Sequence, residues 1–191
     1  QCETTQVRDY GTGASLLGYT KLYGQVPGGQ AEILRVPFAN YGPIKVPEGP
    51  PDDRFVYLSD VLPTAWQAVA YAEVPKGGTL AVWGLGPIGQ MCARIGLQQG
   101  AGRVIGVDIV PERLAMAERH GIETIDAGEV EDAAQSVRNR TTGRGADAVI
   151  DAIGMEAHGS ALAKLAQKTK VQMDRLEGLR TAMGAVRRGG T

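Results

Sequence analysis

One glycine-rich turn constrains the fold of this chain more than any other stretch. The apolar run LAVW at residues 80–83 is typical of a parallel strand buried on both faces, and three glycines spaced G-x-G-x-x-G follow it directly. We expect Gly84 to permit a tight turn from strand to helix, and Gly86 to leave the backbone open to a ligand. Gly89 should let the next helix pack close to the strand.

The residues after the turn extend the pattern of a dinucleotide site. Pro87 suits the first turn of a helix, where its missing N–H is no loss, and Ile88 follows it in that turn. The start of such a helix offers free N–H groups that attract an anion. A second apolar run at residues 104–107 ends on Asp108, about 20 residues beyond the glycines, where such folds bind the adenosine ribose. An ordinary turn between strand and helix and a site for S-adenosylmethionine remain the alternatives, but no Gly-Lys-Ser/Thr follows to make a P-loop.

The composition indicates which binding partners and which cellular compartment suit this chain. The chain has 191 residues and a net charge of −1, so it is suited neither to nucleic acid nor to an anionic membrane. It has no apolar run of about 18 residues and no signal peptide, which predicts a soluble cytoplasmic protein. The two cysteines are Cys2, which is too isolated to form a metal site, and Cys92, which we expect to be a buried apolar filler.

The first 50 residues differ in style from the rest. Runs typical of strands at residues 18–23 and 31–36 alternate with glycine and proline turns, which predicts antiparallel strands without helices. They are too few to close a barrel or sandwich. We interpret them as part of a second domain.

The remainder alternates strands and helices. The local chemistry near residue 60 predicts a helix around Thr64 with Ser59 or Asp60 as its N-cap, and Asp53 lies in a solvated charged loop. Beyond Asp108 we expect strands at 122–125 and 146–153 and helices at 111–120, 129–140, 156–167 and 174–188. A further strand would begin where the chain stops, so both ends look cut and the chain is expected to be a fragment.

Several segments together resemble a known family, the zinc-containing medium-chain alcohol dehydrogenases, and within it the glutathione-independent formaldehyde dehydrogenase branch. The resemblance rests on GGQAE at 28–32, LSDVLPT at 58–64, the glycines at 84–89, VD at 107–108 and DAIG at 151–154.

The resemblance implies a fold class, α/β, in which an incomplete Rossmann-type parallel sheet joins a remnant of an all-β GroES-like catalytic domain. It implies that residues 1–59 are the C-terminal part of that catalytic domain and that residues 60–191 are the NAD-binding domain. It also implies NAD and zinc as cofactors, an alcohol or a hydrated, formaldehyde-like aldehyde as substrate, and a homo-oligomer, dimer or tetramer, when complete.

The resemblance also assigns roles to single residues. Asp60 matches a ligand of the catalytic zinc, and Thr64 matches a catalytic residue near the nicotinamide ring. Asp108 matches the acid that binds ribose and favours NAD over NADP, and Arg113 matches a basic residue beside that ribose. Ala152 and Ile153, at the end of the fourth strand, are assigned to the cofactor site with the turn residues.

The sequence departs from the family in its metal ligands. The cysteine and histidine that complete the catalytic zinc site are missing, as are the three partners of Cys2 in the structural zinc lobe. We therefore expect the chain as given to bind zinc poorly and to be inactive alone. A non-catalytic NAD-binding module and an S-adenosylmethionine-dependent transferase remain the competing functions.

Overall fold

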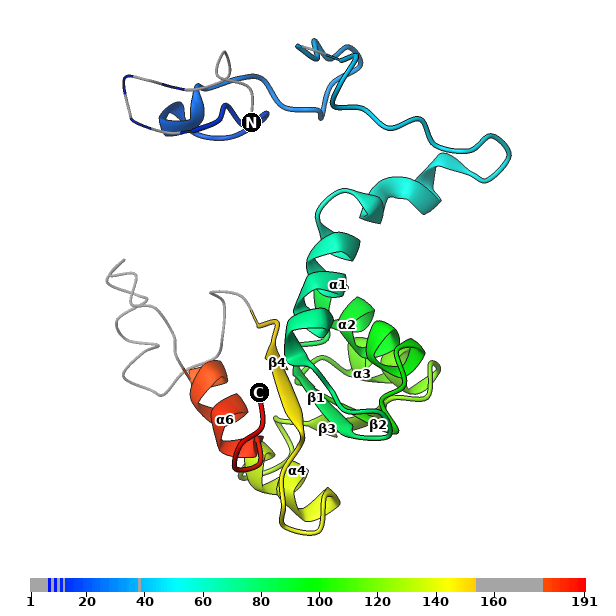
Figure 1. Ribbon diagram of the computed structural model, residues 1–191, viewed down its shortest axis with the longest axis vertical. Coiled ribbons are helices and arrows are strands. Elements are labelled where there is room, and N and C mark those ends of the chain that lie inside the picture. Colours follow the sequence, from blue (N-terminus) through cyan, green and yellow to red (C-terminus); the bar gives the residue numbers. More distant parts are fainter. Residues whose placement is uncertain (1–6, 8, 10, 12, 38, 154–176) are drawn as a thin grey trace. The chain divides into compact units, whose positions relative to one another are not determined.

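The computed structural model describes the whole chain apart from residues 1–6, 8, 10, 12, 38 and 154–176. The chain forms two compact units, Gln1–Gly49 and Pro50–Thr191 (Figure 1). Cys2 and the helix expected at residues 156–167 lie outside the described residues. Each unit is described by itself below.

The first unit lacks the strands expected from its sequence. Its described residues contain the 3-10 helix η3 (Lys21–Tyr23) and a single parallel bridge between Leu17 and Val26, but residues 18–23 and 31–36 form no strand. The expectation of strands there was wrong for this chain, because a short extended segment is stable only when it pairs and buries one face. Large apolar side chains of this unit accordingly remain exposed, including those of Ile33, Tyr41 and Ile44.

The second unit is built on a parallel sheet of four strands. The strands are β1 (Thr79–Trp83), β2 (Arg103–Asp108), β3 (Glu123–Asp126) and β4 (Ala148–Asp151). Their order in the sheet is β3-β2-β1-β4, and every pairing is parallel. This is the order of a Rossmann half-fold, in which the connections reverse direction between β1 and β4. The predicted α/β class is confirmed.

Helices cover both faces of this sheet (Figure 1). They are α1 (Val61–Ala72), α2 (Pro87–Gln98), α3 (Pro111–Glu118), α4 (Ala133–Arg140) and α6 (Glu177–Ala185), with the 3-10 helix η4 (Asp52–Leu58) before α1. The helix expected at 129–140 begins later, because Asp132 caps it by accepting the Gln135 N–H at 3.0 Å. The helix expected at 174–188 is described from Glu177 and ends at Ala185, before residue 188.

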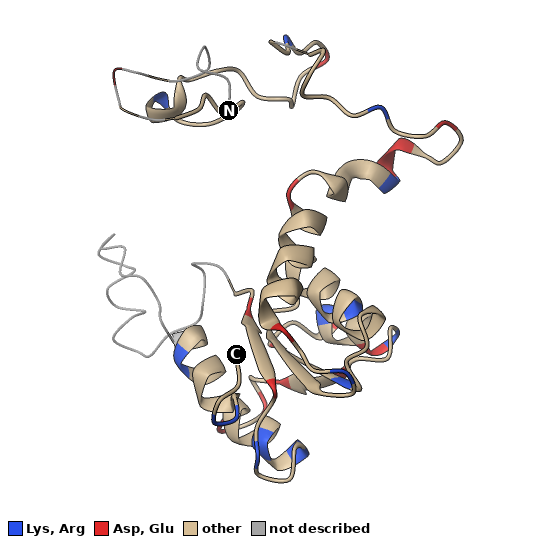
Figure 2. Ribbon diagram, in the orientation of Figure 1, with Lys and Arg blue, Asp and Glu red and all other residues tan. Residues whose placement is uncertain are grey.

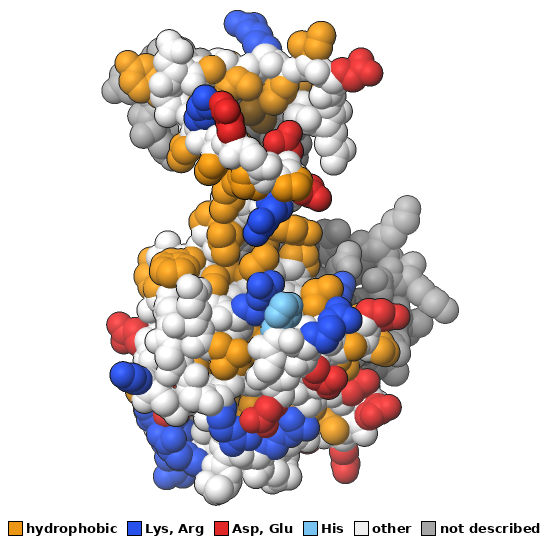
Figure 3. All heavy atoms as spheres, turned by 90° about the vertical axis from the view of Figure 1, so that its right-hand side faces the viewer, with side chains coloured by type: hydrophobic (Ala, Val, Ile, Leu, Met, Phe, Trp, Pro, Cys, Tyr) orange, Lys and Arg blue, Asp and Glu red, His pale blue; other side chains and the backbone are white. Residues whose placement is uncertain are grey.

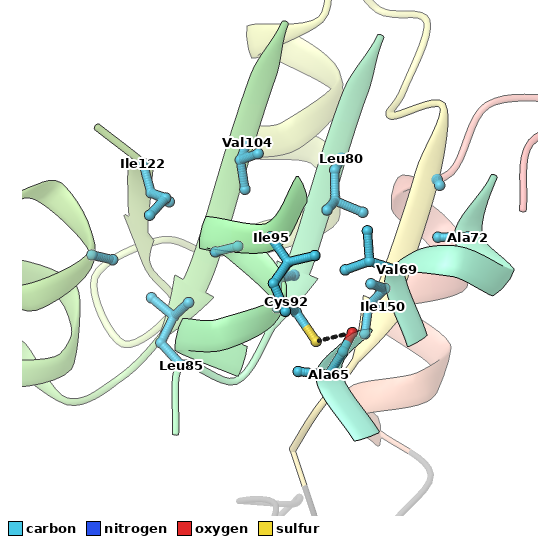
Figure 4. Close-up of a cluster of buried hydrophobic side chains, with 14 of the residues drawn as sticks. Ala65, Val69, Ala72, Leu80, Leu85, Cys92, Ile95, Val104, Ile122 and Ile150 are labelled. Atoms are coloured by element: carbon cyan, nitrogen blue, oxygen red, sulfur yellow. Dashed lines mark hydrogen bonds between the residues drawn. The ribbon is translucent and has the colours of Figure 1, made fainter. Parts of the chain in front are cut away.

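Two apolar layers hold the sheet between its helices. Leu80, Val82 and Val104 face α1, α2 and α3 in one layer, which Figure 4 shows around Cys92 and Ile95. Their neighbours along the strands, including Ala81 and Ile105, face α4 and α6 in the other layer. Burial on both faces explains the continuous apolar runs of β1 and β2, and it excludes charge from the middle of the strands. Charged residues of the sheet accordingly lie at strand ends (Figure 2).

The outer faces of the second unit carry charges of both signs. Figure 3 shows acidic and basic side chains interspersed over the face that it displays, with apolar side chains between them. Among the described residues, no helix is long and apolar enough to cross a membrane.

A buried acid joins three separate segments at the amino ends of β1 and β4. The Asp147 side chain is only 4% exposed, and it accepts hydrogen bonds from Arg144 and Arg187, each at 2.7 Å. Its second oxygen accepts the N–H of Thr79 at 2.9 Å. Burial alone would raise the pKa of Asp147, but the Thr79 N–H and the two guanidinium groups outweigh it and hold the pKa below its usual value. This cluster fastens the segment after α6 to the sheet.

We predict that Asp147→Asn lowers the free energy of unfolding by about 1–2 kcal/mol at pH 7, because charged hydrogen bonds are lost. The pKa of Asp147 is lower in the folded state, so its contribution is complete above the ordinary aspartate pKa of about 3.9 and is lost as pH falls further. Urea unfolding between pH 7 and pH 3 should show the difference from wild type shrinking below about pH 4. A constant difference would contradict this account, and Asp53→Asn in exposed η4 is the control.

Candidate functional site

The turn between β1 and α2 has the geometry that its glycines predict. Gly84 has φ of +82°, which side chains rarely adopt, and a Cβ there would lie 2.9 Å from the carbonyl oxygen of Ala152. A Cβ on Gly89 would lie 1.8 Å from the carbonyl oxygen of Gly84, so the helix can approach the strand only without one. A Cβ on Gly86, in contrast, would meet nothing within 4 Å. The turn is therefore closed at its two ends and open at its middle glycine.

The helix α2 begins at this open position. Gly86 is its N-cap, with φ −66° and ψ −171°, and Pro87 occupies the first helical turn. Ile88 is partly buried and packs against the apolar layer that contains Cys92. The first N–H groups of an α-helix have no intrahelical acceptor and carry a partial positive charge, so the start of α2 can hold an anion beside Gly86.

Asp108 lies at the carboxyl end of β2 and is 7% exposed. One oxygen, Oδ2, accepts the N–H of Leu85 at 2.6 Å, and the other, Oδ1, accepts the N–H groups of Ile109 and Val110 at 2.7 and 2.9 Å. The guanidinium of Arg113, which is half exposed, lies 3.8 Å from Oδ2. A carboxylate has about four acceptor positions, so three are filled from the backbone and one stays available to a ligand.

Ala152 and Ile153 lie beside the glycine turn, across the point where the sheet reverses its connections. Trp83 pairs with Asp151, and the carbonyl oxygen of Trp83 accepts the N–H of Ala152 at 2.7 Å. A Cβ on Gly84 would lie 3.0 Å from the Cγ1 atom of Ile153. Ligands of open parallel sheets bind outside the carboxyl ends of the strands at such a point. The structure thus brings these two residues together with the turn.

Asp60 and Thr64 contact each other at the start of α1. Asp60 is the N-cap position with φ of +69°, but its side chain makes no capping bond. Its Oδ1 accepts the hydroxyl of Thr64 at 2.8 Å instead. In the part of the chain that the structure describes, no group of three or more His, Cys, Asp or Glu could hold a metal. Asp60 is therefore a single carboxylate here, and its assignment as a zinc ligand stays a prediction.

The start of α1 lies next to the helix that carries the turn. The thiol of Cys92 in α2 faces the carbonyl oxygen of Ala65 in α1, at 3.7 Å (Figure 4). Burial raises the pKa of Cys92 to about 11, outweighing its backbone hydrogen bond. The thiol is thus a neutral packing group, as its sequence position predicted.

A hollow of about 450 Å³ lies along β3, away from the residues expected to bind cofactor. Its lining includes Leu114 of α3, Thr124 of β3 and Arg140 of α4. None of the predicted site residues lines it.

The sequence pattern did not predict a role for Gln90. Its side chain is 7% exposed, and its Nε2 donates to the carbonyl oxygens of Leu85 and Arg113 at 3.2 and 2.8 Å. One feature of the sequence could have indicated this role. Gln90 lies three residues before Ala93, on the apolar stripe of α2, where a buried polar side chain needs hydrogen-bond partners.

Comparisons with known proteins agree with this geometry. Residues 87–173 match a family model described as zinc-binding dehydrogenase. Over 99% of its length the chain is 38% identical to a zinc-type alcohol dehydrogenase-like protein of Schizosaccharomyces pombe, of which it covers 46%. Over its whole length it is 40% identical to the zinc-type alcohol dehydrogenase-like protein AdhB of Bacillus subtilis, of which it covers 50%. The chain thus spans about half the length of these relatives.

A more distant relative and a solved structure complete the comparison. Identity to the glutathione-independent formaldehyde dehydrogenase of Pseudomonas aeruginosa is 34% over 74% of the chain and 36% of that protein, which is lower than for the two relatives above. The structure of alcohol dehydrogenase TADH from Thermus sp. ATN1 superposes with a TM-score of 0.74 at 30% identity, covering 99% of this chain and 51% of that one.

The closed end of the turn at Gly89 and its open middle position at Gly86 allow a test of its packing. We predict that Gly89→Ala lowers the free energy of unfolding by about 3 kcal/mol or more, because its Cβ overlaps backbone oxygen rather than a flexible side chain. Gly86→Ala should change it by less than about 1 kcal/mol, because its φ suits alanine and the space is open. Equal losses in urea unfolding of the two variants would refute the close approach at Gly89.

Proposed function

We propose a function that proceeds from one fact: this chain belongs to the zinc-type alcohol dehydrogenase-like family of medium-chain dehydrogenases. The second unit binds NAD, and the complete enzyme is an oxidoreductase that takes hydride from an alcohol or a hydrated aldehyde. In this proposal residues 60–191 are the NAD-binding domain, and residues 1–59 are the C-terminal part of the GroES-like catalytic domain.

The observation that supports NAD binding best is the open space at Gly86. A ligand can lie against the backbone there, directly at the start of α2. The pyrophosphate of NAD carries the negative charge that a helix N-terminus favours. Gly84, Pro87, Ile88 and Gly89 shape this turn, so each acts on the cofactor through the backbone.

The acid at the end of β2 fits the ribose of NAD. With three backbone N–H groups already on its oxygens, Asp108 has one acceptor position left for a ribose hydroxyl. Its negative charge repels the 2′-phosphate of NADP. Arg113 lies beside this acid and would contact the outer side of the same ribose. In this proposal the acid selects NAD through its charge and one hydrogen bond to the ribose.

The rest of the cofactor would extend toward the carboxyl end of β4. Ala152 and Ile153 lie there beside Gly84, so they would contact the nicotinamide half. Thr64, in the α1 helix that packs on α2, would lie near the nicotinamide ring. NAD, when bound there, supplies the acceptor for a hydride.

Zinc in this proposal belongs to the complete enzyme. A catalytic zinc takes three protein ligands and leaves a position open for substrate. The described residues do not make such a site by themselves, and Asp60 would supply one ligand. We propose formaldehyde hydrate as the first aldehyde to test, since the formaldehyde dehydrogenase of Pseudomonas aeruginosa is among the relatives. We further propose that the complete enzyme forms a homo-oligomer.

We predict that NAD binds to this chain and that Asp108→Ala weakens the binding by roughly 10- to 150-fold, because a hydrogen bond to a charged acceptor is lost. Calorimetric titration with NAD, NADP and S-adenosylmethionine measures this directly. Asp132→Asn, at the N-cap of α4, is the matched control, because its carboxylate also accepts a backbone N–H. Preference for S-adenosylmethionine would favour a transferase, and NAD binding without turnover in the complete protein would favour a non-catalytic module.

We predict that Asp60→Ala lowers the zinc content and abolishes turnover of the complete enzyme, because the metal loses one of three ligands. Metal analysis of the purified enzyme, together with NAD reduction by ethanol and formaldehyde, checks this. Asp53→Ala, in the exposed helix η4, should leave both quantities unchanged. Full zinc occupancy in Asp60→Ala would return Asp60 to a structural position at the start of α1.

A further inference from the structure

We propose that Gln90 is a positioning residue that fixes the glycine turn for the pyrophosphate and couples it to the acid that binds ribose. The proposal rests on the proposed NAD site, and neither the glycine motif nor the family comparison assigns Gln90 a role. Gln90 acts on the peptide units of Leu85, the residue between Gly84 and Gly86.

Leu85 is held at both its N–H and its carbonyl. Its N–H donates to Oδ2 of Asp108 at 2.6 Å, and its carbonyl oxygen accepts from Nε2 of Gln90 at 3.2 Å. The Leu85 carbonyl and the Gly86 N–H belong to one peptide unit, and Gly86 is where the open space for a ligand begins. Gln90 and Asp108 therefore fix the orientation of the backbone immediately before the anion site.

The same two side chains meet again at Arg113. Gln90 Nε2 donates to the carbonyl oxygen of Arg113 at 2.8 Å, and the guanidinium of Arg113 lies 3.8 Å from Asp108. Leu85, Asp108, Arg113 and Gln90 thus form a closed ring of polar contacts. The ring spans the end of β1, the end of β2, the first turn of α3 and the first turns of α2. A shift of the turn would therefore also disturb the acid and its arginine.

The Gln90 amide carries a polar atom that packing alone does not explain. Its Oε1 is buried and finds no hydrogen-bond partner among the described residues. A methionine of similar length would fill the space without an unsatisfied acceptor. The cost of the unpaired Oε1 indicates that the other end of the amide, Nε2, has the useful role. Nε2 donates to the carbonyl oxygens of Leu85 and Arg113.

A fixed turn favours binding because the ligand then does not have to order it. Backbone N–H groups already aimed at an anion lose little conformational entropy when the anion arrives. Within this ring, Gln90 Nε2 is the donor to the Leu85 carbonyl oxygen, so a variant that lacks it leaves that oxygen without a hydrogen bond from the ring. NAD and ADP-ribose should depend on Gln90 equally, because they share the pyrophosphate and the adenosine ribose.

The test compares the 191-residue chain with Gln90→Met, which removes the donor, and Gln90→Glu, which puts a carboxylate against two carbonyl oxygens. Calorimetry should show about ten-fold weaker binding of both NAD and ADP-ribose in Gln90→Met, and a larger loss in Gln90→Glu. The thermal midpoint of Gln90→Met should stay near that of wild type. Gln98→Met, at an exposed position of the same helix, is the matched control and should change nothing.

Amide hydrogen exchange reports whether Gln90 fixes the turn, separately from the stability of the second unit as a whole. Without ligand, the Leu85 N–H should exchange faster in Gln90→Met than in wild type, while the N–H groups of central β1 residues exchange as before. Wild-type affinity in Gln90→Met, or an unchanged Leu85 amide, overturns the role of Gln90 and leaves the proposed NAD site intact. Failure of the wild-type chain to bind NAD or ADP-ribose overturns both.

Discussion

The close approach of α2 to the end of β1 is the constraint on which the second unit depends. The Cα atom of Gly89 faces the carbonyl oxygen of Gly84 at a separation that leaves no room for a side chain. This contact sets the angle at which α2 leaves the sheet, and therefore which helical residues reach the apolar layer around Cys92. It also brings the first turn of α2 to the carboxyl ends of β1 and β4. The same contact thus serves core packing and the proposed anion site.

The sequence predicted the sheet well because its strands are buried on both faces. Continuous apolar runs separated by helices leave few arrangements other than a parallel sheet, and the glycine spacing identified its first crossover. The helix ends were less well predicted. The start of α4 is set by Asp132, whose side chain accepts a backbone N–H as the N-cap, and apolar periodicity does not reveal such a hydrogen bond. The first 50 residues were predicted least well, because strands need partners as well as suitable residues.

The site was predictable where function depends on the backbone and less so where it depends on side-chain partners. Gly84, Gly86 and Gly89 could be assigned from spacing, because a missing Cβ has the same consequence in any such turn. Gln90 could not, since its importance comes from carbonyl oxygens on two segments that only the fold brings together. For Asp108 the position was predictable, but the number of backbone N–H groups on its carboxylate was not.

The double engagement of Asp108 has a consequence for how cofactor preference can change. In the proposed site its charge would discriminate against a phosphorylated ribose, and its oxygens also hold the glycine turn and the start of the loop after β2. In the proposed site one side chain therefore sets both cofactor specificity and backbone geometry, and a neutral or basic replacement would alter both. A descendant or an engineered variant that accepts NADP would need compensating contacts for three N–H groups in addition to a binding group for the phosphate. Cofactor preference is in this sense an inherited property of the whole turn.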